Sequence, residues 1–139
     1  MLNHAQIQSR IPHADAMCLL DSVQRWDATT IECSAPAPTA AHPLAGAHGV
    51  PAVAAIEYAA QAAAVHGALL APTEVPRAGM LAKLGDVELS TTGPDPAGGP
   101  LTIRAELLGQ VDAGCQYAFE VFNQRVCLAR GRLMIAYSP

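Results

Sequence analysis

Hydrophobic and polar residues alternate along several short stretches of the chain, with the two-residue period of a half-buried β-strand. Residues 30–35 place Ile31, Cys33 and Ala35 on one face and polar side chains on the other. Strands are also predicted over five further stretches: residues 17–27, 80–89, 101–107, 115–121 and 126–137. Most of these strands follow one another through short turns, so we expect antiparallel pairing.

A different pattern occupies residues 51–71, where ten of the twenty residues after Pro51 are alanine. Alanine is the best helix former, Pro51 suits the first helical position, and Pro72 ends the segment. The segment is apolar on nearly every side. Two strands, one long helix and four strands therefore predict an α+β domain whose sheet curls around a buried helix.

Composition limits what this domain can be. A chain of 139 residues suits one domain, spanning residues 1–139. Charged residues make up only 14% and apolar residues 51%, which favours a homo-oligomer that hides apolar surface. The net charge of −4 and the scattered basic residues argue against a nucleic-acid partner. Glu57, Gln61 and His66 interrupt the apolar segment, so we expect a core helix and no membrane span.

Four cysteines, at positions 18, 33, 115 and 127, lie in strand-like sequence without the C-x-x-C spacing of a zinc or redox site. We expect buried free thiols, and their presence without an export signal indicates the cytoplasm. The sequence has no Gly-rich phosphate loop, no G-x-S-x-G and no H-E-x-x-H. We therefore expect no metal and no other cofactor.

Glu57 is the most informative residue, because a carboxylate within an alanine-rich helix must be hydrogen-bonded, paired or neutral. Gln61 lies four residues later on the same helical face and could hold the Glu57 side chain in one rotamer. The alternative is that Glu57 faces water or an interface.

Two histidines, His42 and His48, lie in the loop that leads into the helix. A single loop histidine is ordinarily a surface residue. These two precede a helix N-terminus, however, whose free N–H groups and dipole favour a developing negative charge. An acid, a base and oxyanion donors could therefore converge there. His66 lies about half a turn out of phase with Glu57 and is expected to face away from it.

The chain reads I-P-H at 11–13 and L-L-D-S-V at 19–23, and its alanine-rich segment reads P-A-V at 51–53 and E-Y-A-A-Q at 57–61. In these motifs the sequence resembles bacterial 3-hydroxyacyl-acyl-carrier-protein dehydratases, which have a similar opening and the helix P-G-V-x-x-x-E-A-x-A-Q. The similarity extends more weakly to about Tyr137. It is greatest to the small dehydratase subunits of aryl-polyene pigment clusters, whose helix often reads I-E-Y-A-A-Q-A.

This resemblance implies a hotdog fold in which two subunits pair to complete each active site. It implies that the catalytic residues are His42 and Glu57, and that the backbone N–H near Ala52 binds the thioester oxygen. Gln61 is expected to assist in substrate binding. The loop departs from the family pattern, since the Phe-Pro-Gly that follows the family histidine is missing. His48 therefore stays open as an alternative to His42.

The implied reaction is dehydration of a (3R)-hydroxyacyl thioester, carried by acyl carrier protein or coenzyme A, to a trans-2-enoyl thioester. His42 would remove the α-proton and Glu57 would protonate the departing 3-hydroxyl. The alternatives are a hotdog acyl thioesterase, a catalytically silent partner of a second dehydratase subunit, and a non-enzymatic thioester-binding module. A basic cluster without acids, Arg125, Arg130 and Arg132, is a candidate docking site for an acidic carrier protein, with solvent-facing arginines as the alternative.

Overall fold

The computed structural model describes residues 1–10, 18–39, 41–47, 49–71 and 79–137. The I-P-H sequence at 11–13 and His48 lie outside the described residues. Their predicted roles therefore stay predictions.

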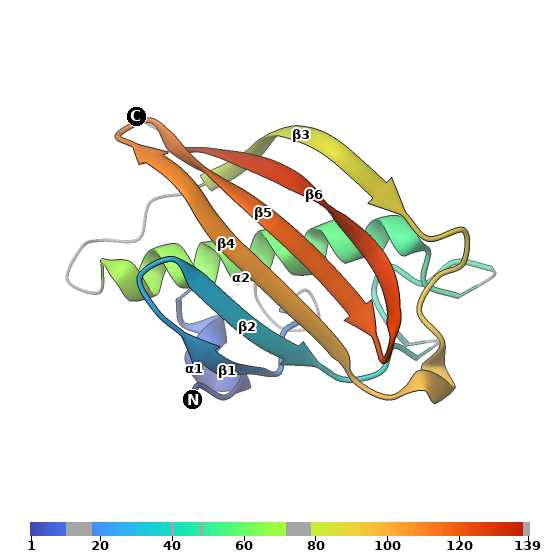
Figure 1. Cartoon of the computed structure of the whole chain (residues 1–139). Helices are drawn as coiled ribbons and strands as arrows, with labels where there is room; N and C mark the ends of the chain where they lie inside the picture. Colours follow the sequence, from blue (N-terminus) through green and yellow to red (C-terminus); the bar gives the residue numbers. More distant parts are fainter. Residues whose placement is uncertain (11–17, 40, 48, 72–78, 138–139) are drawn as a thin grey trace.

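Six strands form one antiparallel sheet in the order β1-β2-β4-β5-β6-β3 (Figure 1). Their bounds are β1 Ser22–Trp26, β2 Thr30–Ala35, β3 Gly79–Leu89, β4 Leu101–Val111, β5 Gly114–Asn123 and β6 Val126–Tyr137. All six strands predicted from the sequence are present, although β1 is shorter than residues 17–27. The helix lies between β2 and β3 in the chain, and β3 joins the sheet at the edge opposite β1, beside β6.

The long helix α2 spans Ala55–Leu70 and follows a 3-10 turn, η2, at Ala52–Ala54. Pro51 is the residue before that turn and has an extended backbone, so the helical path begins one residue later than predicted. A short helix, α1 (His4–Gln8), and a second 3-10 turn, η3 (Pro96–Gly98), were not expected from the sequence.

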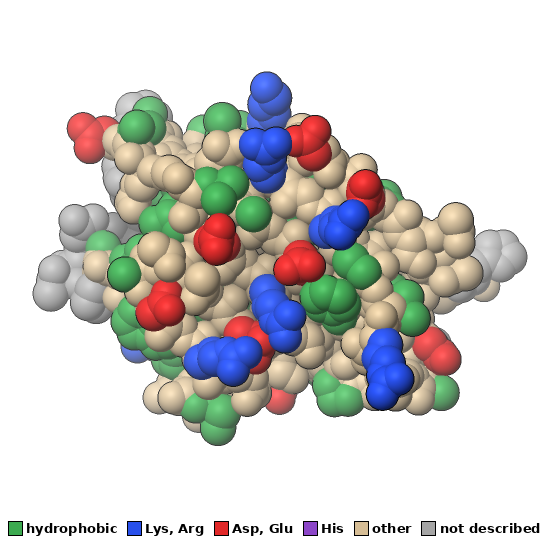
Figure 2. Space-filling model, in the orientation of Figure 1, with side chains coloured by type: hydrophobic (Ala, Val, Ile, Leu, Met, Phe, Trp, Pro, Cys, Tyr) green, Lys and Arg blue, Asp and Glu red, His purple; other side chains and the backbone are tan. Residues whose placement is uncertain are grey.

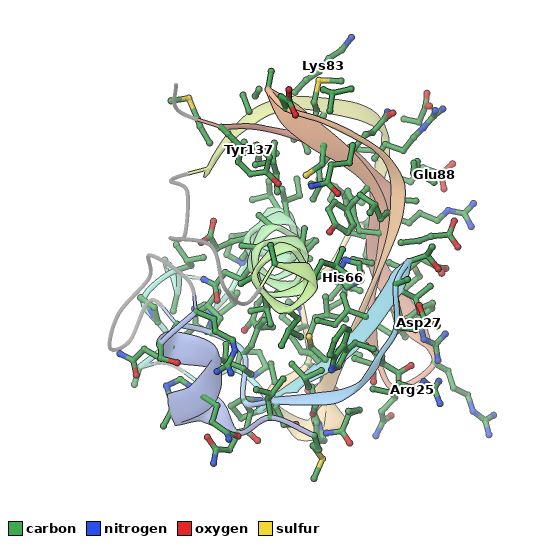
Figure 3. All side chains as sticks on the ribbon, turned by 90° about the vertical axis from the view of Figure 1, so that its left-hand side faces the viewer. Arg25, Asp27, His66, Lys83, Glu88 and Tyr137 are labelled. Carbon is green, nitrogen blue, oxygen red and sulfur yellow. The ribbon has the colours of Figure 1, made fainter. Side chains whose placement is uncertain are left out.

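The sheet curls around α2, as the view along the helix shows (Figure 3). The inward residues of β2 are buried, with Ile31, Cys33 and Ala35 exposed by 2% or less. Alanines predominate on α2, and their small side chains let β2, β4, β5 and β6 pack against it. A curved antiparallel sheet around one helix is the hotdog arrangement, which confirms the predicted fold class.

The segment Ala52–Leu70 is long and apolar enough to cross a membrane by length and composition alone. Half of it is buried inside the domain, however, and the sheet covers it. This is the setting of a core helix in a soluble protein. All four cysteines are free thiols, and only Cys127 is partly exposed.

Candidate active site

The start of the helix is a 3-10 turn that no side chain caps. Pro51 stands at the capping position, and its side chain has no group that could accept a hydrogen bond. The backbone N–H groups at this turn, including that of Ala52, therefore belong to the part of the helix that favours negative charge. Ala52 itself is half-buried.

Gly93, between β3 and β4, lies against this turn and was not identified from the sequence. A Cβ atom at Gly93 would be 2.0 Å from the carbonyl oxygen of Val50 and 3.5 Å from the nitrogen of Ala52. Only glycine allows the two backbones to approach this closely. The sequence signal was a glycine in a Pro/Gly-rich loop, which does not reveal what the loop covers.

Glu57 and Gln61 are brought together by α2. The Gln61 amide nitrogen donates to Glu57 Oε1 at 3.1 Å, and its oxygen accepts the backbone N–H of Leu19 at 2.9 Å. Because that N–H can only donate, the orientation of the Gln61 amide is settled, with its NH₂ group toward Glu57. Gln61 is fully buried, whereas Glu57 is half-buried. Gln61 therefore holds one oxygen of the Glu57 carboxylate, and the Glu57 side chain is partly accessible to solvent.

His42 is hydrogen-bonded to Tyr58, the residue that follows Glu57. Its Nε2 lies 2.9 Å from the Tyr58 hydroxyl, and its Nδ1 accepts the backbone N–H of Leu44 at 3.0 Å. Both ring nitrogens are thus engaged in this structure. Burial lowers the pKa of His42, so the ring is neutral at neutral pH.

Tyr58 is 2% exposed, and burial raises its pKa to about 12, so its hydroxyl stays protonated. Sequence reasoning assigned no role to this residue, because a tyrosine in an apolar helix ordinarily belongs to the core. Its contact with His42 ties the loop before η2 to the helix that carries Glu57.

His66 faces the sheet, away from this site, as its phase on the helix predicts (Figure 3). The ring is fully buried, with Nδ1 2.6 Å from the Tyr117 hydroxyl and Nε2 2.8 Å from the carbonyl oxygen of Asp27. These bonds connect α2 to β5 and to the β1–β2 turn. His66 is therefore a core residue.

Within the described ranges, no three His, Cys, Asp or Glu side chains gather as metal ligands would. The candidate site instead offers a carboxylic acid, an imidazole, a phenol and backbone N–H groups. This set can move protons and stabilise an oxyanion.

The outer face of the sheet carries charges of both signs side by side (Figure 2). One row crosses all six strands with alternating sign: Arg25, Glu32, Arg104, Glu120, Arg130 and Glu88. A groove of about 670 Å³ runs over this face and is lined by both acidic and basic side chains. Its mixed charge gives no preference for an anionic partner.

The prediction of an acid-free basic cluster at the C-terminal end of the chain is wrong. Arg130 pairs with Glu88 at 2.6 Å, and Arg132 pairs with Asp86. Both acids belong to β3, which lies next to β6 in the sheet although more than forty residues separate the paired residues in the chain. Arg130 and Arg132 therefore neutralise neighbouring acids, so the predicted acid-free cluster of these two residues with Arg125 does not form.

Comparisons with known proteins find similarity to dehydratases. The family model "ApeP-like: ApeP dehydratase" matches residues 5–139. The dehydratase heterocomplex ApeI:P from Xenorhabdus doucetiae contains a chain with 24% sequence identity and a TM-score of 0.79, over 96% of this chain and 91% of that one. No curated protein sequence matches the chain.

Thioesterases are more distant structural neighbours. A mutant of the thioesterase SAV0944 from Staphylococcus aureus has 16% identity and a TM-score of 0.64, over 85% of this chain and 93% of that one. A hypothetical thioesterase from Streptococcus pneumoniae, solved with coenzyme A, has 11% identity and a TM-score of 0.62, over 84% of each chain. At this level of identity both show a shared fold.

Proposed function

Because this chain belongs to the ApeP-like dehydratase family, we propose that it dehydrates (3R)-hydroxyacyl thioesters to trans-2-enoyl thioesters. The acyl group would be carried by acyl carrier protein or by coenzyme A, in fatty-acid or polyene biosynthesis. The observation that carries the proposal is Glu57, held by Gln61 on α2 one turn after an uncapped helix start. The four free thiols fit a cytoplasmic protein.

Each part of the site has one task in this reaction. The thioester carbonyl accepts hydrogen bonds from the backbone N–H groups near Ala52, which stabilise enolate-like charge. His42 takes the α-proton, and Glu57 protonates the departing 3-hydroxyl, so that water leaves. Gln61 fixes the carboxylate beside the substrate. No cofactor takes part in these steps.

One observation favours a second candidate, a silent subunit that supports another dehydratase. A general base needs a lone pair directed at the substrate, yet Nδ1 of His42 already accepts the Leu44 N–H and Nε2 faces Tyr58. The base role therefore requires that the turn at 42–44 exchange one of these contacts for the substrate. In a silent subunit the same contacts would simply anchor the loop.

We propose that the chain assembles with a second subunit through β3, as a homodimer or with another dehydratase chain. β3 is an edge strand, with one neighbour, β6. Its exposed apolar side chains are Met80, Leu81, Leu84 and Leu89. An exposed apolar edge strand is a site for pairing with another chain. The relative from Xenorhabdus doucetiae is itself described as a heterocomplex.

The test is to incubate the protein with a crotonyl or cinnamoyl thioester and to follow enoyl absorbance and free thiol together. Loss of the enoyl chromophore without thiol, abolished by Glu57→Gln, supports reversible hydration and hence dehydration. Thiol release with the same dependence on Glu57 would instead indicate a thioesterase. No change in either signal would favour the silent subunit.

A further inference from the structure

The hydrogen bonds of His42 allow only one arrangement of protons on its ring. The backbone N–H of Leu44 can only donate, so Nδ1 carries a lone pair. The neutral imidazole has a single N–H, which must then be at Nε2. The Nε2–H therefore donates to the hydroxyl oxygen of Tyr58, and the Tyr58 hydroxyl is the acceptor.

The second histidine–tyrosine pair of the chain has the opposite direction. The carbonyl oxygen of Asp27 can only accept, so the proton of His66 is also at Nε2. Nδ1 of His66 must then accept, and Tyr117 is the donor. Tyr58 thus accepts a hydrogen bond that keeps the proton on Nε2 of His42. Tyr117 instead donates a hydrogen bond to Nδ1 of His66, a ring that is fully buried.

We propose that Tyr58 is a positioning residue that holds the proton of His42 on Nε2 and so makes Nδ1 the basic nitrogen. The inference rests on the base role proposed above for His42. An acceptor on one ring nitrogen keeps the proton there and leaves the other nitrogen to take the substrate proton, as in other catalytic histidines. Tyr58 suits this task because it is buried and follows Glu57 on α2.

In this arrangement the Leu44 N–H marks the position that the substrate must occupy. It donates to Nδ1 from two residues later in the turn at 42–44, and the α-carbon of the substrate displaces it. The lone pair of Nδ1 then forms the new N–H bond, and the electrons of the C–H bond form the double bond. The C–O bond breaks, and its oxygen takes a proton from Glu57 to leave as water. The imidazolium keeps its Nε2–H on Tyr58, now as a stronger, charge-assisted bond.

Long-range ¹H–¹⁵N NMR of the histidine side chains tests the proton arrangement directly. We expect His42 as the Nε2–H tautomer, with a proton signal that Tyr58→Phe removes or exposes to rapid exchange with water. Tyr117→Phe is the matched control, because it removes the hydroxyl of the other buried pair. It should perturb the His66 signals and leave those of His42 in place. A proton on Nδ1 of His42 in the wild type, or an Nε2–H signal unchanged by Tyr58→Phe, would overturn the proposal.

Thioester hydration supplies the functional readout. Tyr58→Phe should lower kcat about tenfold or more, the scale for groups that orient an active-site histidine, with little change in KM. Tyr117→Phe should leave kcat close to that of the wild type. An unchanged kcat in Tyr58→Phe would reject the positioning role even if the tautomer is as expected. If the wild type has no activity that Glu57→Gln removes, the proposed function fails instead, and the NMR result still decides the tautomer.

Discussion

Gln61 joins Glu57 to the segment before β1, because its amide donates to the Glu57 carboxylate and accepts the backbone N–H of Leu19. Both partners depend on one fully buried side chain. The amide therefore connects the stability of the core to the geometry of the carboxylate.

Replacing Gln61 by methionine, which has a similar size and no amide, should leave the Leu19 N–H buried without a partner. The expected loss of unfolding free energy is roughly 1–3 kcal/mol, the usual cost of an unsatisfied buried group. Urea unfolding measures it. Gln110→Met, at an exposed position on β4, is the control and should change stability little. Equal stability of the two variants would contradict the assigned role.

Gly93→Ala should displace the β3–β4 loop from the helix start. The new methyl group would lie 2.0 Å from the carbonyl oxygen of Val50, so the backbones must separate. We expect a loss of about 1–3 kcal/mol, as for other overpacked sites, together with a loss of thioester hydration. Gly109→Ala is the matched control, since a Cβ there meets nothing within 4 Å. Unfolding midpoints and hydration rates that match in the two variants would exclude a role for the close approach.

The main elements could be predicted from the sequence because each has its own local pattern of residues. The alternation in 30–35 and 101–107 and the alanines of 51–71 are local patterns, and local patterns determine strands and helices. The short helix α1 has no comparable hydrophobic period. The capping box between Asn3 and Gln6 is a local signal of its start that the sequence analysis did not use, whereas the contact of His4 with the carbonyl oxygen of Leu20 joins distant parts of the chain.

The candidate site was predictable only within one element. The contact between Glu57 and Gln61 follows from helical spacing, and the structure contains it. The contacts of Gln61 with Leu19, of His42 with Tyr58 and of Arg130 with Glu88 join distant parts of the chain. These contacts depend on how the segments that contain Leu19 and His42 pack on α2 and on the position of β3 in the sheet. Neither can be deduced from composition or period.

Asp27 should make stability depend on pH in the acid range. The backbone N–H groups of Thr29 and Thr30 donate to its carboxylate and lower its pKa from 3.8 to about 2. Because the folded pKa is the lower one, this stabilisation is complete above about pH 4 and is lost as the pH falls toward 2. Asp27→Asn should therefore be less stable than the wild type at pH 5, and the difference should shrink by pH 2. Urea midpoints at the two pH values measure it, and a constant difference would contradict the assignment. The variant keeps the backbone carbonyl that binds His66.

The assembly should depend on the β3 edge. We expect light scattering to give a homodimer at micromolar concentration, and Met80→Asp, at a residue 71% exposed on β3, to shift it toward the monomer. Val111→Asp is the control, because Val111 is similarly exposed but lies at the end of the interior strand β4. If the wild type is monomeric, the homodimer is ruled out, and pairing with a different subunit is the remaining form of the proposal. An equal response of the two variants would reject β3 as the interface.

His42→Ala should reduce thioester hydration by roughly 10²-fold or more, the usual scale for a lost general base. The same change also removes the contact with Tyr58, so the loop could move and lower the rate for a structural reason. His42→Gln separates the two effects, because its amide NH₂ can still donate to the Tyr58 hydroxyl but its side chain cannot act as a base. If His42 is the base, both variants should be equally slow while the unfolding free energy of His42→Gln stays near that of the wild type. Recovery of the rate in His42→Gln would make His42 a loop anchor and require that the proton acceptor come from another residue or from the partner subunit.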